Sequence, residues 1–374
     1  MAADRQRQPV ECVIKVDDTE ITDLYPYLRE AQVSMSRRAA TTATLSFDSV
    51  RLEDGHWSVQ DAGVFEAWKS ISVEAAFGDE TEEVMRGFIK EVRCEYPEDM
   101  SAARVTVTAQ DESLVLDREH VRGPLSTEES PVADGDIVSD IARDHNLDVD
   151  ADPGLTNAAL NIDGTYVRLL RDRAEANGFE FYVRGGTLYF HAPKLDQDPA
   201  PEPIRVYAGP ATNCLRFSVQ YDGHKPDEVA VMRAAESGTE AEEGRYTPDL
   251  RLLGTTAANS ASRGLEPFVW RMQAPSGATS DEVQARAQAK ANENAWKITA
   301  DGELDGSLYG HVLLTHALVV VDGAGEENSG TYYVDEVQHR FSQEGYREGF
   351  KLLRNATGDD SEPGLVSSIA ALFA

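Results

Sequence analysis

The chain has 374 residues, which is enough for two or three domains with sizeable cores. Its 66 acidic and 35 basic residues give a net charge of -31, and so negative a surface repels nucleic acid, which excludes nucleic-acid recognition as the main role. Hydrophobic residues make up 41%, and no run of about eighteen apolar residues occurs, so no helix is expected to span a membrane.

Residues 10–120 are predicted to be mostly β. From Arg104 to Gln110 apolar and polar side chains alternate, as expected of a strand with one buried face. Turn signals such as Asp54-Gly55 separate the candidate strands. The expected strands cover residues 10–16, 43–47, 70–77, 86–96 and 104–110. Short strands at this spacing favour a barrel or a sandwich.

The segment 121–203 changes to helical periodicity. One helix is expected over residues 136–145, and Thr165 is a suitable N-cap for a second helix that Gly178 ends. A hairpin over residues 179–190 follows. We interpret this segment as a small α+β unit inserted between two β domains.

Residues 204–356 return mainly to strand patterns. Ser280 is expected to cap a helix that runs through Trp296. The polar stretch 234–267 has no clear period and is predicted to be a surface excursion. The expected strands cover residues 215–220, 228–233 and 313–321.

A last pair of strands is expected between Gly330 and Asn355. Val337, His339 and Phe341 alternate along the first strand, and Gly345 can take the positive φ that a tight hairpin turn requires.

This hairpin resembles that of a known family. The order S-G-T-Y-Y-V-D-E-V-Q-H-R-F over residues 329–341, followed by F-K-L-L-R-N over 350–355, is similar to the closing hairpin of the phage late control gene D family, the hub proteins of contractile tails. The segments A-E-A-N-G and F-E-F-Y-V-R-G-G-T-L-Y-F over 174–190 resemble its middle part, and residues 221–229 lie where that family begins its second barrel. The matches are spread over most of residues 10–356.

The resemblance implies an α+β, mainly β fold with two tail-tube-like β-barrel domains and a small inserted α+β unit. We place the first barrel domain at residues 1–120 and the inserted unit at 121–203. The second barrel domain then covers 204–356, and a linker with an apolar tail covers 357–374.

The resemblance also implies a function. The chain is expected to be the structural baseplate hub of a contractile injection particle: a phage tail, a tailocin or an extracellular injection system. As a homotrimer, similar to the hub part of type VI spike proteins, it would join the sixfold tail tube to a threefold spike. The expected partners are the tail tube protein, a separate spike protein and other baseplate proteins, without nucleic acid. Assembly is expected in the cytoplasm, before incorporation into the particle.

No catalytic pattern stands out in the sequence. His311 and His316 do not form H-E-x-x-H, and on the expected strand they would lie on opposite faces. His339 is expected to be a packed strand histidine. No catalytic, cofactor-binding or metal residue is assigned, and no cofactor is expected. Because acids are abundant, a carboxylate pair for glycoside hydrolysis stays open, so a tail-associated peptidoglycan or polysaccharide hydrolase is the alternative function.

The cysteines, one glycosylation triplet and a group of aromatic residues are expected to have structural roles or none. Cys12, Cys94 and Cys214 contain no C-x-x-C pattern and are expected to be small apolar strand residues. Asn355-Ala-Thr357 is a glycosylation triplet that we attribute to chance. Five aromatic residues are expected to pack in the barrel or at interfaces, with a carbohydrate platform as the alternative: Tyr25, Tyr27, Trp57, Phe65 and Trp68.

The acidic surface also has two explanations. One is a host with a salty cytoplasm, and the other is an acidic channel or docking face. The acids are scattered through nearly every loop, which favours the halophile-like explanation.

The end of the chain is predicted to be a docking peptide. An acidic linker follows Asn355, and the apolar residues beyond it share one helical stripe. They are Leu365, Val366, Ile369, Leu372 and Phe373. So short a helix is not stable alone in water, so the stripe is expected to bind the spike or a neighbouring hub subunit, or to fold back on its own second domain.

Overall fold

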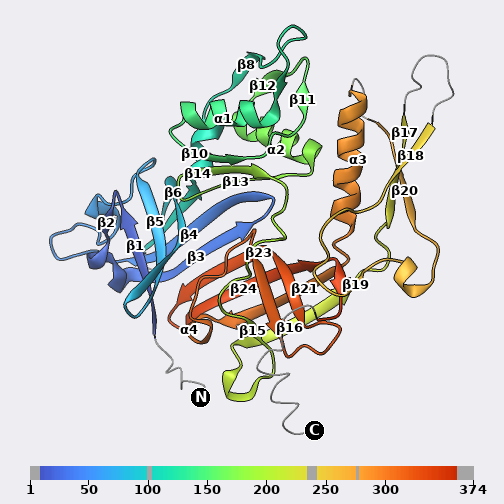
Figure 1. Ribbon diagram of the computed structural model, residues 1–374. Coiled ribbons are helices and arrows are strands. Elements are labelled where there is room, and N and C mark those ends of the chain that lie inside the picture. Colours follow the sequence, from blue (N-terminus) through green and yellow to red (C-terminus); the bar gives the residue numbers. More distant parts are fainter. Residues whose placement is uncertain (1–8, 99–102, 234–241, 275–277, 360–374) are drawn as a thin grey trace.

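The computed structural model describes residues 9–98, 103–233, 242–274 and 278–359. A single curled sheet of 13 strands dominates the described part of the chain (Figure 1). Its main path has the order β16-β21-β24-β23-β3-β4-β7-β6-β5-β1-β2, and β22 adds to β23 with β15 beside it. The N-terminal strands are β1 (Val10–Val16), β2 (Thr19–Glu20), β3 (Leu28–Ser36), β4 (Ala39–Ser49), β5 (Ser70–Phe77), β6 (Glu80–Glu95) and β7 (Ala103–Asp111). The C-terminal strands are β15 (Ile204–Arg205), β16 (Cys214–Tyr221), β21 (Ile298–Asp305), β22 (Leu318–Asp322), β23 (Gly330–Ser342) and β24 (Gly345–Arg354).

Alternation of side chains explains why these segments are strands. In β7, every second residue is buried, from Ala103 through Val105 and Val107 to Ala109, while the residues between them face outward. The N-terminal strands surround one hydrophobic core that includes Ile14, and the C-terminal strands surround a second that includes Leu304. The expected α+β, mainly β class with two β units is confirmed.

The two β units are joined edge to edge. β23 pairs antiparallel with β3, with Val337 opposite Met35 and Phe341 opposite Ala31. Phe341 and Tyr346 of the β23–β24 hairpin belong to the N-terminal core, whereas Val337 belongs to the C-terminal core. The hairpin therefore contributes to both cores. Gly345 has a φ of 102°, as the turn requires.

The inserted unit has its own core, which includes Leu170 and Phe190. Thr165 caps α2 by accepting a hydrogen bond from the Arg168 amide, and Gly178 ends α2 with a φ of 70°, both as expected. The unit contains β8 (Val121–Pro124), β9 (Val132–Ala133), α1 (Asp134–Asp144), β10 (Asp148–Ala151), β11 (Thr156–Asn157), β12 (Asn161–Gly164), α2 (Tyr166–Asn177), β13 (Glu180–Arg184) and β14 (Thr187–His191).

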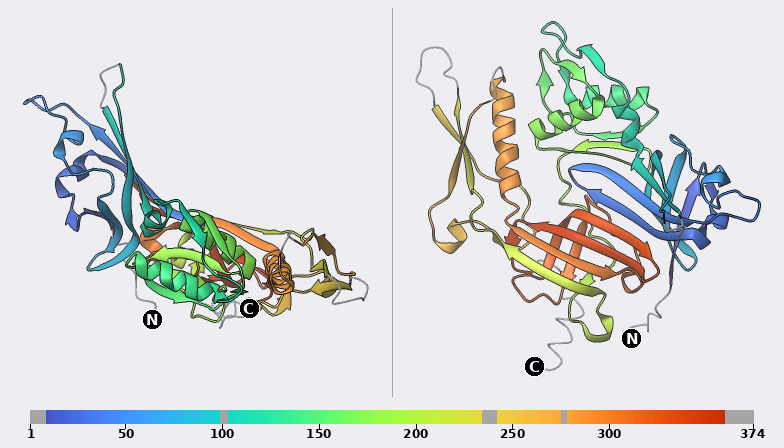
Figure 2. Two further views of the ribbon diagram at one scale, coloured as in Figure 1. Left: turned by 90° about the horizontal axis from the view of Figure 1, so that it is seen from above. Right: turned by 180° about the vertical axis from the view of Figure 1, so that it is seen from behind.

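A separate arm extends from the C-terminal unit. It consists of β17 (Glu228–Arg233), β18 (Glu242–Tyr246) and β20 (Val269–Met272), which form a three-stranded sheet against α3 (Ser280–Asn294). Figure 2 shows this arm at one end of the molecule and the N-terminal strands at the other, with the inserted unit between them.

Two expectations about the C-terminal unit were wrong in part, and a third is described in the next paragraph. The stretch 234–267 is not only a surface excursion, because it contains β18 and two buried positions, Leu253 and Ala258, that lie in hydrophobic clusters. The N-cap of α3 is Thr279 and not Ser280, since the Thr279 side chain accepts from the Glu282 amide.

The predicted strand over residues 313–321 is shorter than expected, because β22 begins only at Leu318. The preceding segment is irregular: His316 has a φ of 62°, and the Leu313 amide donates to the carboxylate of Glu348.

The remaining short elements complete the fold. They are η1 (Thr22–Tyr27), η2 (Gln60–Ala62), η3 (Glu112–Asp117), η4 (Gly209–Ala211), η5 (Ala261–Arg263), α4 (Gly306–Tyr309), β19 (Thr256–Ala257) and β25 (Ala356–Thr357). Among the helices of the described ranges, none is long and apolar enough to cross a membrane.

Candidate functional site

Glu180 is the centre of a buried polar junction. It begins β13 and is 4% exposed. Its carboxylate accepts a hydrogen bond from the Tyr333 hydroxyl at 2.5 Å and lies 2.8 Å from Nδ1 of His316 and 3.4 Å from Nη1 of Arg37. Burial opposes ionisation, but His316 and Arg37 outweigh it and lower the pKa of Glu180.

Arg37 extends this junction to two further carboxylates. Its side chain is 8% exposed and lies 3.2 Å from both Asp335 and Glu293. Burial alone would lower the pKa of Arg37, and the charges of Glu293, Glu180 and Asp335 raise it instead. The guanidinium is therefore a buried cation shared among three acids.

The junction connects all three parts of the molecule. Arg37 lies between β3 and β4, Glu180 in the inserted unit, Asp335 on β23 and Glu293 on α3. His316 adds the loop before β22, and its ring stacks on Tyr182 with centroids 3.8 Å apart. Each charged group at the junction already has a fixed partner, so the role of the junction is to hold these parts of the molecule together.

His311 and His316 do not come together at one site. His311 lies 2.7 Å from Glu82 of β6, whereas His316 faces Glu180. Their segment is not a strand, so the expected arrangement on opposite faces of a strand was wrong. Within the described ranges, no group of three or more His, Cys, Asp or Glu residues is placed to hold a metal ion.

His339 is packed in the sheet, as expected. It has no exposed surface, and its Nδ1 lies 2.8 Å from the Tyr346 hydroxyl. Glu348, also fully buried, is 3.5 Å away. Burial lowers the pKa of His339 to about 3 and raises that of Glu348 to about 8.

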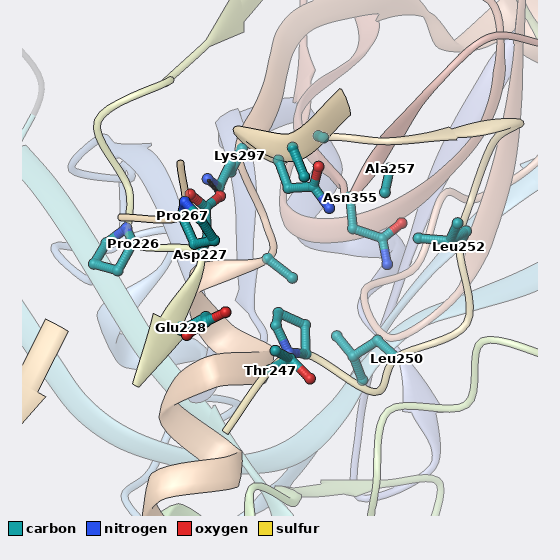
Figure 3. A pocket seen from close by; sticks show the side chains of 15 residues that line it. Pro226, Asp227, Glu228, Thr247, Leu250, Leu252, Ala257, Pro267, Lys297 and Asn355 are labelled. Carbon is teal, nitrogen blue, oxygen red and sulfur yellow. Dashed lines mark hydrogen bonds and ion pairs between the residues drawn. The ribbon is translucent and has the colours of Figure 1, made fainter. Parts of the chain in front are cut away.

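A pocket of about 260 Å³ lies where the arm meets the main sheet (Figure 3). Asp227 and Lys297 form an ion pair there, and Asp227 also accepts from the Ser260 and Phe268 amides. Burial opposes ionisation of Asp227, but its hydrogen bonds with Lys297 and Ser260 lower its pKa. This pair anchors the loop that leads to β20.

Asn355 lines the same pocket (Figure 3) and is 3% exposed. Its amide nitrogen donates to the Arg251 carbonyl at 2.8 Å, and its amide oxygen accepts from the Leu253 amide at 2.9 Å. The Asn355 side chain thus holds the Arg251–Leu253 segment in place. Because the side chain is buried and both of its amide atoms are hydrogen-bonded, we attribute the glycosylation triplet to chance.

The aromatic residues mostly pack as expected. Tyr25, Tyr27 and Phe65 lie against the N-terminal core. Trp57 contacts the ring of Tyr96, with centroids 5.4 Å apart. Trp68 is half exposed, and the guanidinium of Arg118 lies 4.0 Å from its ring centre.

The three cysteines all lie on strands, but they are not equally packed. Cys214 is buried, Cys12 is half-buried and Cys94 is exposed. The expectation of a packed position was wrong for Cys94.

The predicted docking residues lie outside the described residues, so their role stays a prediction. They are Leu365, Val366, Ile369, Leu372 and Phe373. Sequence reasoning missed Arg37 and Glu293, because nothing in the local pattern distinguishes them from the many exposed charges. It also missed Glu180, whose one signal is its place as a charged residue at the apolar start of a hairpin.

A family model described as "Alg8 N-terminal domain" matches residues 6–343. Among curated proteins none matches the sequence. The resemblance to the late control gene D family stays a prediction.

Several solved structures are similar. The 43 kDa tail protein of prophage MuSo2 from Shewanella oneidensis gives a TM-score of 0.68 at 14% identity, with 93% of this chain and 99% of the other covered. A tail protein from Neisseria meningitidis MC58 gives 0.63 at 12%, with 93% and 97% covered. The Escherichia coli c3393 protein, described as a component of the type VI secretion system, gives 0.52 at 10%, with 96% and 80% covered. The chain thus has the fold of these tail proteins.

Proposed function

This chain belongs to the family of the Alg8 N-terminal domain, and from its tail-protein fold we propose that it is the structural baseplate hub of a contractile injection particle. In this role it is a trimeric adaptor that joins a sixfold tail tube to a threefold spike. Its work is binding and not bond making. It is assembled in the cytoplasm and then becomes part of the baseplate.

The observation that carries this proposal is the pairing of two β units in one sheet. Each unit has its own core, and β23 and β3 join them edge to edge. Three copies of a chain with two such units contain six (3 × 2), which suits a sixfold partner on one face and a threefold partner on the other.

An exposed sheet edge supports contact between copies. In the described part of the chain, β16 pairs only with β21, so its second edge offers unpaired backbone groups. Leu215 and Tyr221 on β16 are 53% and 40% exposed. An edge strand with exposed apolar side chains is suited to a neighbouring subunit.

The test is to isolate the assembled particle and count this chain at the base of the tube. Imaging of the particle should show three copies in a closed ring around a hollow axis, between the tube and the spike. A ring of six copies, or a single copy beside the tube, would contradict the proposal.

A further inference from the structure

A groove of about 610 Å³ separates the inserted unit from the arm. Residues of α2 and β13 form one wall, and residues of α3 and β20 form the other (Figure 1). The walls meet where Gly178 ends α2, because a Cβ at Gly178 would lie 2.8 Å from the Cβ of Ala289 on α3. Arg38, from the turn after β3, also lines the groove.

The groove has the opposite charge balance from the rest of the molecule. It is lined by five basic residues and three acidic ones, while the whole chain has 35 basic and 66 acidic residues. Two of the three acids, Glu180 and Glu293, are already paired with Arg37. Arg171 and Lys290 are exposed and form no ion pair with a described residue.

Apolar side chains lie beside these cations. Trp270, which is 50% exposed, lines the groove together with the half-buried Met272 and Phe181. A groove that combines free cations with an exposed indole is suited to an extended or helical segment that has both acidic and apolar residues.

We propose that this groove binds the acidic, apolar end of the same chain, residues 360–374. Asp360 and Glu362 match the free cations, and the apolar stripe beyond them matches the Trp270 side of the groove. No other stretch of the chain that lies outside the described residues combines an acidic run with an apolar stripe.

The end of the chain lies close enough to reach the groove. The Asn355 amide nitrogen is 2.8 Å from the Arg251 carbonyl, and the adjacent residue, Leu250, lines the groove. The 15 residues from 360 to 374 can span about 50 Å when extended. A tethered segment also has an effective concentration on the order of millimolar, which favours binding within one chain.

Hydrogen exchange on the full chain tests this proposal. Amides of residues 365–373 should exchange slowly in the wild type and about 3- to 10-fold faster in R171E/K290E, the range expected for two exposed ion pairs. The matched control is R104E/R122E, which changes the charge equally at two exposed positions outside the groove. Its exchange should equal that of the wild type.

Charge reversal of the tail provides the second arm. Adding D360K/E362K to R171E/K290E should restore the slow exchange, because the attraction is re-formed with opposite signs. Fast exchange in the wild type, or equal exchange in the groove and control variants, would overturn the proposal. Protection that grows with protein concentration would assign the tail to a neighbouring copy and would overturn binding within one chain.

Discussion

Glu348 illustrates how a single buried residue makes stability depend on pH. It has no exposed surface, and burial, together with the nearby charge of Glu82, raises its pKa to about 8. The ordinary pKa of a glutamate is 4.5. Between pH 4.5 and about 8, the folded state therefore keeps a proton on Glu348 that the unfolded state has released. This residue therefore contributes less stability at higher pH.

His339 has the opposite effect over a lower range. Its pKa falls from 6.5 to about 3, so the unfolded state binds a proton that the folded state does not. The stability associated with neutral His339 is lost as the pH falls below 6.5. Between pH 4.5 and 6.5 the effects of the two residues on the unfolding free energy oppose each other. Above pH 6.5, of these two residues only Glu348 still changes the unfolding free energy.

We expect the unfolding free energy of the wild type to fall by up to about 2 kcal/mol between pH 6.5 and 8 because of Glu348. Glu348→Gln should remove this slope, because glutamine does not ionise. Urea unfolding at several pH values measures it, and the exposed Glu344→Gln is the control. An unchanged slope in Glu348→Gln would show that Glu348 ionises in the folded state at its ordinary pKa.

The Arg37 junction gives a second test at the residue scale. Glu180→Ala leaves a buried cation without its most buried partner, and we expect a loss of about 3–5 kcal/mol in unfolding free energy. Chemical denaturation of Arg37→Ala, Glu180→Ala and the double variant gives the coupling energy.

The exposed pair Arg29–Asp48, at 3.3 Å, is the matched control for this cycle. Its removal should cost less than about 1 kcal/mol, because solvent screens it. Equal costs at the two pairs would show that burial at the junction adds nothing.

At the scale of elements, the free edge of β16 is the feature with the most direct consequence. The sheet places β16 at one end of its strand order, and the side chains of Leu215 and Tyr221 face solvent in the single chain. A strand of this kind is stable within its own sheet through β21, so its exposed apolar residues are not required for folding.

We expect L215K/Y221K to fold normally and to weaken trimer formation, with an increase of tenfold or more in the dissociation constant, about 1.4 kcal/mol. Sedimentation measures the association, and circular dichroism checks the fold. Tyr207→Lys is the control, because Tyr207 is 92% exposed and lies outside β16. If all variants associate equally, the β16 edge is not a contact between copies.

At the scale of the whole molecule, the net charge acts against the proposed trimer. The net charge of -31 gives a trimer -93 (3 × 31), so self-repulsion opposes association. Salt weakens this repulsion, since the Debye length falls from about 10 Å at 0.1 M to about 3 Å at 1 M.

The trimer should therefore become more stable as the KCl concentration rises from 0.1 to 1 M. Native mass measurement or sedimentation at each salt concentration tests this expectation. A trimer equally stable at both concentrations would contradict the halophile-like explanation of the acidic surface.

Local sequence patterns determined much of this molecule. The caps of α2 at Thr165 and Gly178, the alternation along β7 and the turn at Gly345 act over a few residues, so their signals are complete in the sequence. The cap of α3 was placed one residue too late, because Thr279 and Ser280 are both suitable N-caps. The irregular segment before Leu318 was missed because a distant side chain, Glu348 of β24, accepts from the Leu313 amide.

The tertiary structure alone decided how these pieces meet. The pairing of β23 with β3 joins residues about three hundred positions apart, and Arg37 reaches Glu180 and Glu293 from different parts of the chain. Likewise, the basic groove is assembled from α2, α3 and the turn after β3. Such contacts have no local signature, because burial and charge pairing depend on which surfaces come together after the strands and helices have formed.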